Sequence, residues 1–559
     1  MSHDHHIPTA SEKLRLEPGE RLFRPFHRFA SMSSAGGIVL LAMTVVAMIW
    51  ANSKYAHVYD EVFHDTQVAI SVEHHPHHAS GHGEDEGNHE DNVHSEEDHP
   101  VVGNDETAHP QSGTAIVSAM DGTVGIPEGT PEISEDHGDE SANDHGDGHA
   151  AGHESKDKPP YFFMGHGLTH WINDLLMAVF FLVVGLEIKR EILVGELASP
   201  KRAALPIFGA IGGMVAPAAI FAAINWGNAD NIPGWGVPMA TDIAFAVGVM
   251  AMLGNKIPNS LKVFLLSLAI VDDLGALVVI AVFYTENLQA QYLGYAGSII
   301  AVLLAMNILR VRWITAYLLL GLPLWYCVYQ SGVHATIAGV LLAFTIPAHA
   351  RVNAVNFSYS TRKALEIFDD AHDDKDTDVK QSTIRRAAVF AMITNARQVL
   401  PPLHRIETVL HPWAAFFIIP VFALANAGIE IHGGIGDAVK GNVSLGIIAG
   451  LVIGKPLGIT LFAFMACKVG IAALPRGVTW RHIAGAGMLG GIGFTMAIFI
   501  ANLAYESNAY NLEHAKLAIL IASAISAVGG AFILSTCKSQ AEPEPETLGP
   551  VVGGYDENS

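Results

Sequence analysis

Two adjacent acidic residues, Asp272 and Asp273, lie in the middle of the long apolar run over 265–280. An acidic side chain at the centre of a membrane helix costs about 2.5–3.5 kcal/mol, so a pair of them predicts a functional site. Carboxylate oxygens suit hard cations, and burial favours the protonated carboxyl group, so the two chemistries expected are cation and proton binding. Because neighbouring side chains on an α-helix point about 100° apart, the two aspartates cannot face the same place.

Few other ionisable residues fall within apolar runs. Asp242 follows Thr241 in a segment that also contains Pro238, and Lys455 lies in Gly454–Gly458. One of the paired aspartates could meet Lys455 while the other faces water. Glycines at 485, 487, 490, 491 and 493 disfavour a continuous helix in another apolar run. Two interrupted spans predict a transporter binding site. At such a site Asp242 could offset the positive N-terminal ends of the half-helices, and Lys455 could offset their negative C-terminal ends.

The elements that must hold these residues are membrane spans. The chain has 559 residues, of which 50% are hydrophobic and 16% charged, which is typical of a polytopic membrane protein rather than a soluble enzyme. The three cysteines show no metal or disulfide spacing. Apolar runs predict twelve transmembrane helices, at about 33–51, 167–188, 203–225, 236–254, 261–284, 293–309, 313–329, 331–347, 411–428, 445–467, 483–504 and 514–536.

The distribution of Lys and Arg sets the expected orientation. With the N-terminus inside, 26 of the 32 basic residues fall in inside segments and 5 in outside loops, and Lys455 lies in a span. Cytoplasmic loops hold such an excess, so we expect both termini in the cytoplasm.

Two long inserts interrupt the predicted helical domain over 31–536. The outside insert, 73–158, contains thirteen histidines among acids, glycine and proline, and should be disordered. The inside insert covers 350–403 and contains a short predicted helix around 384–393. A cytoplasmic segment over 1–30 precedes the domain, and an acidic tail over 537–559, expected to be disordered, follows it.

Seven segments closely resemble the NhaA family of sodium/proton antiporters. They are Thr241–Ala246, Ala269–Ala276, Ser331–Thr336, Leu410–Trp413, Ala425–Gly428, Gly454–Gly458 and Gly491–Met496. The resemblance implies an all-α membrane protein with inverted-topology repeats, in which the fourth and eleventh helices are discontinuous and cross; the family is itself a standard example of such repeats.

The resemblance also implies roles for individual residues. Asp273 would be the principal Na⁺- and proton-binding carboxylate, with Asp272 sharing the site or pairing with Lys455. Asp242 and Lys455 would compensate the crossed helix ends, and Thr241 could add an oxygen near the ion. Whether Lys455 is a structural partner or a proton carrier stays open. The residues that resemble the family's pH sensor are Glu187, Arg190, Glu191, Glu407 and His334, although Thr408 stands where relatives often have a histidine.

The activity implied is electrogenic exchange of Na⁺ or Li⁺ for more H⁺ in a bacterial inner membrane, in contact with lipid, without cofactor or nucleic acid. A homodimer is expected, although the outside insert interrupts the region that forms a small dimerising hairpin in relatives.

The residues also allow two alternatives. The insert histidines, for example His74, His75, His77 and His78, could bind zinc or copper weakly, which would suit a metal-binding or metal-transporting protein. Asp242 and Asp273 could instead form an intramembrane aspartic protease dyad. Against the protease, Asp272 and Lys455 would have no role, and neither candidate has a Gly-x-Gly-Asp context.

Overall fold

The computed structural model describes residues 35–73, 118–119, 161–285, 288–350, 352–370, 383–429, 436 and 439–537. Contacts divide the chain into one unit of residues 1–60 and 169–559 and a second of residues 61–168. The predicted segment 1–30, nearly all of the outside insert and almost the whole acidic tail lie outside the described residues.

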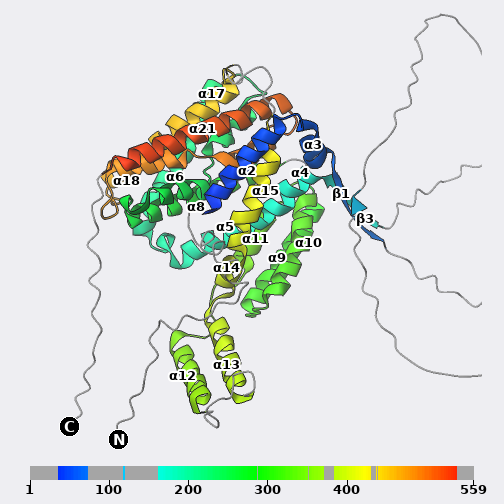
Figure 1. Cartoon of the computed structure of the whole chain (residues 1–559), viewed down its shortest axis with the longest axis vertical. Coiled ribbons are helices and arrows are strands. Elements are labelled where there is room, and N and C mark those ends of the chain that lie inside the picture. The colour runs from blue at the N-terminus through cyan, green and yellow to red at the C-terminus, as the bar shows by residue number, and fades with distance from the viewer. Residues whose placement is uncertain are drawn as a thin grey trace, which may run out of the picture. The chain divides into compact units, whose positions relative to one another are not determined.

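The first unit is built from helices (Figure 1). The α-helices among the described residues are α2 (Ala35–Ala51), α3 (Ala56–Asp60), α4 (Leu168–Trp171), α5 (Met177–Val194), α6 (Pro200–Ile224), α7 (Ile243–Met252), α8 (Asn259–Phe283), α9 (Ala290–Ile308), α10 (Ile314–Gln330), α11 (Ile337–Thr345), α12 (Ala354–Asp370), α13 (Thr383–Val399), α14 (Pro402–Trp413), α15 (Ile419–Asn426), α17 (Asn442–Ala449), α18 (Lys455–Lys468), α19 (Trp480–Gly490), α20 (Phe494–Ala504) and α21 (Ala509–Ser535). Short 3₁₀ and π segments are η1 (Glu61–Asp65), η2 (Ile172–Leu176), η3 (Glu196–Ala198), η4 (Ile232–Met239), η5 (Gly254–Lys256), η6 (Ala414–Ile418) and η7 (Gly450–Gly454).

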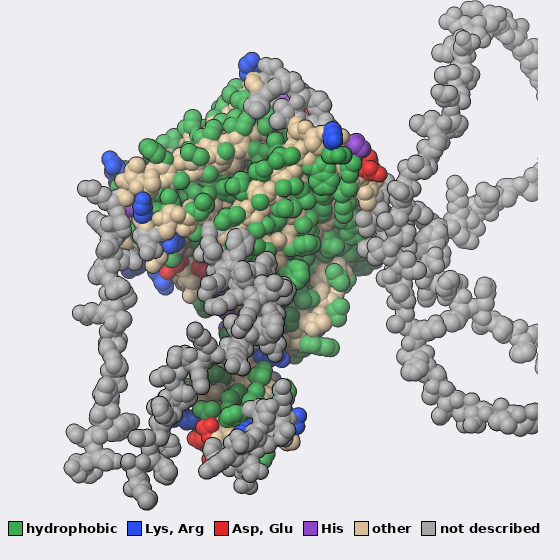
Figure 2. All heavy atoms as spheres, in the orientation of Figure 1, with side chains coloured by type: hydrophobic (Ala, Val, Ile, Leu, Met, Phe, Trp, Pro, Cys, Tyr) green, Lys and Arg blue, Asp and Glu red, His purple; other side chains and the backbone are tan. Residues whose placement is uncertain are grey.

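Among the described residues, eight helices are long and apolar enough to cross a membrane, or nine if α19 and α20 form one bent span. Two shorter apolar helices, α2 and α10, add to these. Figure 2 shows a broad hydrophobic surface over the helices of this face, with Lys and Arg near its edges. Exposed apolar side chains in such number are stable only against lipid, so the chain is a multi-pass membrane protein.

The predicted eighth span, 331–347, differs most from the structure. Its helix, α11, has only 9 residues. Gly332 adopts a φ of +81°, which ends α10, and the Ser331 hydroxyl donates to the Val328 carbonyl 2.7 Å away. Because this turn extends to residue 336, the apolar run is shared between a turn and a short helix, which hydropathy alone does not distinguish.

Two membrane segments are interrupted near their middles. The 3₁₀ segment η4 ends at Met239, residues 240–242 are non-helical, and α7 begins at Ile243. Likewise α19 ends at Gly490 and α20 begins at Phe494, with a 46° bend between them. Pro238 and the glycines predicted breaks in these two regions.

The position of η4 depends on two tyrosines that lie just beyond helix ends. Tyr505 donates to the Asn231 carbonyl 2.7 Å away, and Tyr284 donates to the Pro233 carbonyl, also 2.7 Å away. Burial raises the pKa of Tyr505, so its hydroxyl remains a donor at neutral pH. Gly234 and Gly236 leave the space that the two rings occupy, since a Cβ at either would collide with a tyrosine hydroxyl.

Lys455 is positioned by the packing of α18 against α6. At the closest approach, a Cβ on Gly212 would meet the Gly458 carbonyl oxygen, and a Cβ on Gly458 would meet that of Gly212. Small residues allow helix backbones this close in a membrane, where van der Waals packing stabilises association. The start of α18 is thereby fixed beside α6.

The second unit contains a small sheet of order β2-β1-β3. Strands β1 (Gln67–Glu73) and β3 (Tyr161–Gly167) pair antiparallel, with Glu73 opposite Tyr161, and β2 (Ser118–Ala119) pairs with β1. The all-α prediction is therefore confirmed for the described residues of the first unit, but it did not include this sheet. The cause is local: β1 alternates Val68, Ile70 and Val72 with smaller or polar residues, a pattern that favours a strand.

Within the predicted inside insert, α12 and α13 pack side by side (Figure 1). The chain then enters α14, whose Leu403 and Ile406 join a buried apolar cluster with residues of α5, α9, α10 and α11. This cluster holds α14 against the membrane helices.

Candidate ion-binding site

Asp272 and Lys455 form a fully buried ion pair. The Lys455 Nζ atom donates to Asp272 Oδ2 across 2.6 Å and also donates to the Met239 carbonyl at the end of η4. Thr241 Oγ1 lies 2.7 Å from the same carboxylate oxygen and 2.9 Å from the Gly490 carbonyl at the end of α19. Since a hydroxyl has one hydrogen, Thr241 donates to one of these oxygens at a time.

Asp273 has a different environment, although it is the next residue. Its buried side chain lines a cavity of about 170 Å³. The polar residues that line this cavity with it are Glu187, Asp242, His411 and Thr495; neither Asp272 nor Lys455 lines it. The pair predicted from the sequence is therefore divided between an ion pair and a cavity, as expected for side chains about 100° apart on α8.

Asp242 caps two helices at once. Its Oδ1 atom accepts a hydrogen bond from the Phe245 backbone N–H at 2.9 Å, at the start of α7. Its Oδ2 atom accepts from the Thr495 hydroxyl at 2.6 Å and the Thr495 N–H at 3.3 Å, at the start of α20. The negative charge therefore lies at two positive helix N-termini, where it is electrostatically stabilised.

The two interrupted segments meet at these residues. The Asp242 N–H donates to the Ile492 carbonyl at 2.7 Å, and Thr241 reaches Gly490 of the other segment. Each segment thus supplies a helix C-terminal carbonyl and a helix N-terminus: Met239 and α7 from one, Gly490 and α20 from the other. Lys455 binds the Met239 carbonyl and Asp242 caps both N-termini.

A second cluster surrounds Arg190. Its guanidinium donates to Glu407 and, at 3.2 Å, to Glu191, and lies 3.8 Å from Glu187. Three carboxylates from α5 and α14 thus share one cation, and Glu187 also lines the Asp273 cavity. Four of the five residues that resemble the family's pH sensor are therefore brought together.

The fifth, His334, lies elsewhere. Its Nδ1 atom is 2.8 Å from Thr336 Oγ1, and its Nε2 atom is 3.8 Å from Asp174 Oδ1. His170 Nε2 lies 3.0 Å from the other oxygen of Asp174. His334 thus belongs to a group around Asp174. The insert histidines His74, His75, His77 and His78 lie outside the described residues.

Sequence reasoning missed two residues of the site. Thr495 donates to Asp242, and His411 lines the Asp273 cavity, but in the sequence each is marked only as a member of a segment that resembles the family. The hydrogen bond between Thr495 and Asp242 could not be predicted from the sequence, since 253 positions separate the two residues.

Comparison with known proteins identifies the family. The model of the family "Na+/H+ antiporter 1" matches residues 27–82 and 154–534. The chain belongs to this family. It is 41% identical to a Na⁺/H⁺ antiporter NhaA of Oleidesulfovibrio alaskensis over 544 residues, covering 97% of this chain and 100% of the relative. It is 49% identical to the NhaA of Wolinella succinogenes over 68% of this chain and 84% of the relative, and 47% identical to that of Helicobacter pylori over 68% and 85%.

Family membership confirms the resemblance seen in the motifs. The protein is a Na⁺/H⁺ antiporter, and hence a secondary transporter rather than an enzyme. The aspartic protease alternative is therefore rejected. The family model has no counterpart of residues 83–153, which form most of the His-rich insert.

Proposed function

We propose that this antiporter exchanges Na⁺ or Li⁺ for a larger number of protons, with Asp273 as the carboxylate for which the two cations compete. The observation that carries this proposal is that Asp273 lines a cavity, whereas its neighbour Asp272 is held by Lys455. A buried, charged carboxylate is unstable without a counter-ion, so Asp273 requires either a proton or a metal cation.

Asp272 contributes the second ligand. Its Oδ2 atom is engaged by Lys455 and Thr241, but its buried Oδ1 atom has no hydrogen-bond partner among the described groups. Asp272 does not line the Asp273 cavity in this structure, so a hard cation that prefers oxygen ligands would have to draw this oxygen toward Asp273, with the Thr241 hydroxyl nearby. Binding of Na⁺ would then weaken the attraction between Asp272 and Lys455.

We further propose that the chain has twelve spans arranged as inverted repeats, with the η4–α7 and α19–α20 segments as the two discontinuous crossing helices. The hydrogen bonds between residues 241–242 and 490–492 support this arrangement, as do the charges at the four helix ends. Alternating access would occur around these crossed helices. A transporter whose site is empty and charged would not convert between its inward- and outward-facing states.

Exchange of one Na⁺ for more than one H⁺ carries net charge, so the membrane potential contributes to export. Its contribution is about 2.3 kcal/mol per charge per 100 mV. Such export would serve sodium and pH homeostasis. The Arg190 cluster would sense cytoplasmic pH, because its three carboxylates share a single guanidinium and one of them reaches the transport cavity.

The bacterial inner membrane, with both termini in the cytoplasm, is the proposed location, supported by the excess of Lys and Arg in the segments assigned to that side. The proposed organisation is a helical domain over 31–536, interrupted by inserts at 73–158 and 350–403, between terminal segments 1–30 and 537–559. A homodimer is proposed, with the β1–β3 pair corresponding to the dimerising hairpin of relatives.

The decisive experiment measures Na⁺- or Li⁺-induced proton movement in inside-out vesicles. Asp273→Asn should abolish exchange, because a neutral amide cannot alternate between a proton and a metal cation. The matched control is Asp230→Asn, which makes the same change at an exposed site and should leave exchange intact. Persistent exchange by a correctly inserted Asp273→Asn protein would refute the site assignment.

A further inference from the structure

Lys189 is a half-buried cation of α5 that the proposed transport mechanism does not use. Its Nζ atom donates to three backbone carbonyls at the end of α11: Phe344 at 2.6 Å, Ile346 at 2.5 Å and Ala343 at 3.5 Å. None of the ion pairs between described residues includes Lys189. This cation therefore binds the backbone of a neighbouring helix and not an acidic side chain.

The end of α11 requires such partners. The last four carbonyls of an α-helix lack an intrahelical donor, and their negative partial charge favours a nearby cation. Besides the three carbonyls that Lys189 binds, the Thr345 carbonyl accepts from the Asn307 side chain of α9 at 2.6 Å. The Pro347 carbonyl accepts from the Leu403 N–H of α14 at 3.2 Å. Donors from α5, α9 and α14 thus bind every carbonyl from 343 to 347.

Helices α5 and α11 are already in close contact before they reach Lys189. A Cβ on Gly339 of α11 would lie 2.1 Å from the Ala178 carbonyl oxygen of α5. A Cβ on Gly185 of α5 would lie 2.8 Å from the Cβ of Ala343. Small residues permit this close approach of two membrane helices. Because Lys189 lies one turn beyond Gly185, its hydrogen bonds extend the contact to the end of α11.

Lys189 and Arg190 are consecutive residues, so their side chains leave α5 about 100° apart. Lys189 reaches the end of α11, and Arg190 reaches Glu407 of α14. A rotation or displacement of α5 that broke the Lys189 hydrogen bonds would also move the Arg190 guanidinium relative to its carboxylates. The titratable groups around Arg190 come from α5 and α14, and they are Glu187, Glu191, Glu407 and His404, whose Nδ1 atom lies 3.7 Å from Glu407.

We propose that Lys189 is a positioning residue of the cytoplasmic pH response. By binding the end of α11 it fixes the place on α5 from which Arg190 meets Glu407. Without these hydrogen bonds, α5 can shift and the guanidinium can withdraw. A more distant cation stabilises charged carboxylates less, so exchange should then reach half its maximum at a higher pH. This inference rests on the proposed role of the Arg190 cluster as the pH sensor.

The test measures Na⁺-induced proton movement against pH in inside-out vesicles that contain the full chain. Lys189→Met removes the donor and should raise the pH of half-maximal exchange by about 0.5 unit. Lys189→Arg keeps a charged donor and should stay close to the parent. The matched control is Lys201→Met, which removes the same charge from an exposed position of α6 and should leave the midpoint unchanged.

A double variant separates positioning from a direct effect of the lysine charge. If Lys189 acts through Arg190, Lys189→Met should cause no further shift in an Arg190→Gln background, because the guanidinium that it positions is absent. A direct charge effect would add in both backgrounds, since independent effects are additive. An equal shift in the two backgrounds would therefore overturn the proposal.

The melting temperature of each purified variant separates positioning from a purely structural role. If Lys189→Met melts at a lower temperature but keeps the midpoint of the parent, Lys189 only stabilises the fold and the proposal is wrong. If Arg190→Gln shifts the midpoint and Lys189→Met does not, the inference fails while the sensor role of the Arg190 cluster stands. If Arg190→Gln itself causes no shift, the cluster is not the sensor and both ideas are rejected.

Discussion

Lys455 contacts Asp272 and does not line the cavity of Asp273, so two adjacent carboxylates of α8 have separate partners. The ion pair is completely buried. Desolvation of a buried pair offsets much of its Coulomb attraction, but an unpaired charge left in its place is strongly destabilising. The pair therefore makes the fold dependent on both charges, while Asp273 remains available to the transported ions.

The first prediction concerns the loss of Lys455. Lys455→Ala should lower stability by about 3–5 kcal/mol, because it leaves Asp272 charged and buried. Adding Asp272→Asn should recover part of the loss in the melting temperature of the purified protein. Lys468→Ala, at an exposed position of the same helix, is the control.

A measurement of Na⁺/H⁺ exchange distinguishes the two roles of Lys455, which are structural partner of Asp272 and proton carrier. If Lys455 is a structural partner, Lys455→Ala vesicles retain part of the Na⁺-induced proton movement. Complete loss of exchange in a variant that melts like the parent would assign proton transport to Lys455 instead.

The sequence was sufficient to identify the aspartate pair and Lys455, because ionisable residues in apolar runs are few and each demands an explanation. It also located both helix interruptions, since Pro238 and clustered glycines act locally. The sharing of Asp242 between α7 and α20 could not be predicted in detail, because the capping partners are brought together by the fold.

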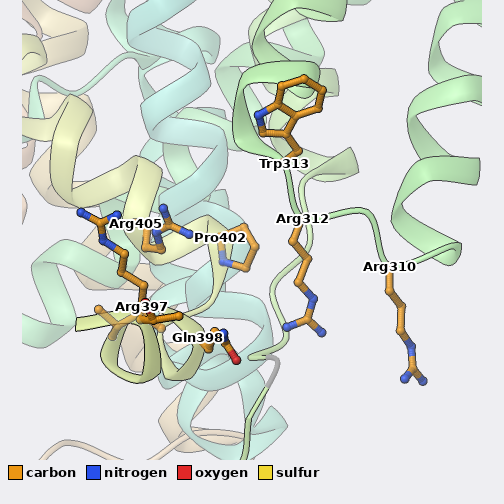
Figure 3. A pocket seen from close by; sticks show the side chains of 9 residues that line it. Arg310, Arg312, Trp313, Arg397, Gln398, Pro402 and Arg405 are labelled. Carbon is orange, nitrogen blue, oxygen red and sulfur yellow. The ribbon is translucent and has the colours of Figure 1, made fainter. Parts of the chain in front are cut away.

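The other features of the structure that the sequence did not predict have two physical causes. The short helix α11 follows from a tight turn at Gly332, whose apolar context resembles that of a span. The Arg190 cluster and the group of Arg310, Arg312, Arg397 and Arg405 consist of residues near helix ends, where solvated charges are ordinary. Family resemblance identified the first, and only the structure shows that Arg312, Arg397 and Arg405 line one cavity (Figure 3).

The second prediction concerns the double cap at Asp242. Asp242→Asn can still cap α7 through its amide oxygen, but its NH₂ group would face the Thr495 donors. We expect a stability loss of about 0.5–2 kcal/mol, the usual range for a lost cap, and reduced exchange. Thr495→Val should show the same effects more weakly, while Thr495→Ser, which keeps the hydroxyl, should resemble the parent. Equal behaviour of the Val and Ser variants in melting and exchange assays would contradict this account.

The third prediction uses opposite charge changes in the Arg190 cluster. Arg190→Gln removes the shared cation, which favours protonation of the remaining carboxylates, so the pH of half-maximal exchange should rise by about one unit or more. Glu407→Gln removes a neighbouring negative charge and should move the same midpoint to lower pH. Arg202→Gln, at a side chain that is 60% exposed, should leave the midpoint unchanged. Shifts of the same sign in the first two variants would exclude an electrostatic sensor.

The fourth prediction separates antiport from a function that depends on metal bound to the His-rich insert. Glu73 lies opposite Tyr161 at the end of the β1–β3 pair, so deletion of residues 74–158 leaves two chain ends that a short turn can join. Because the family model has no counterpart of 83–153, the shortened protein should retain Na⁺-induced proton movement in vesicles. A matched variant keeps the full insert but replaces His74, His75, His77 and His78 with Gln. If exchange is lost in both variants and the parent loses it with a zinc chelator, the insert is a required metal site and not an accessory to the antiporter.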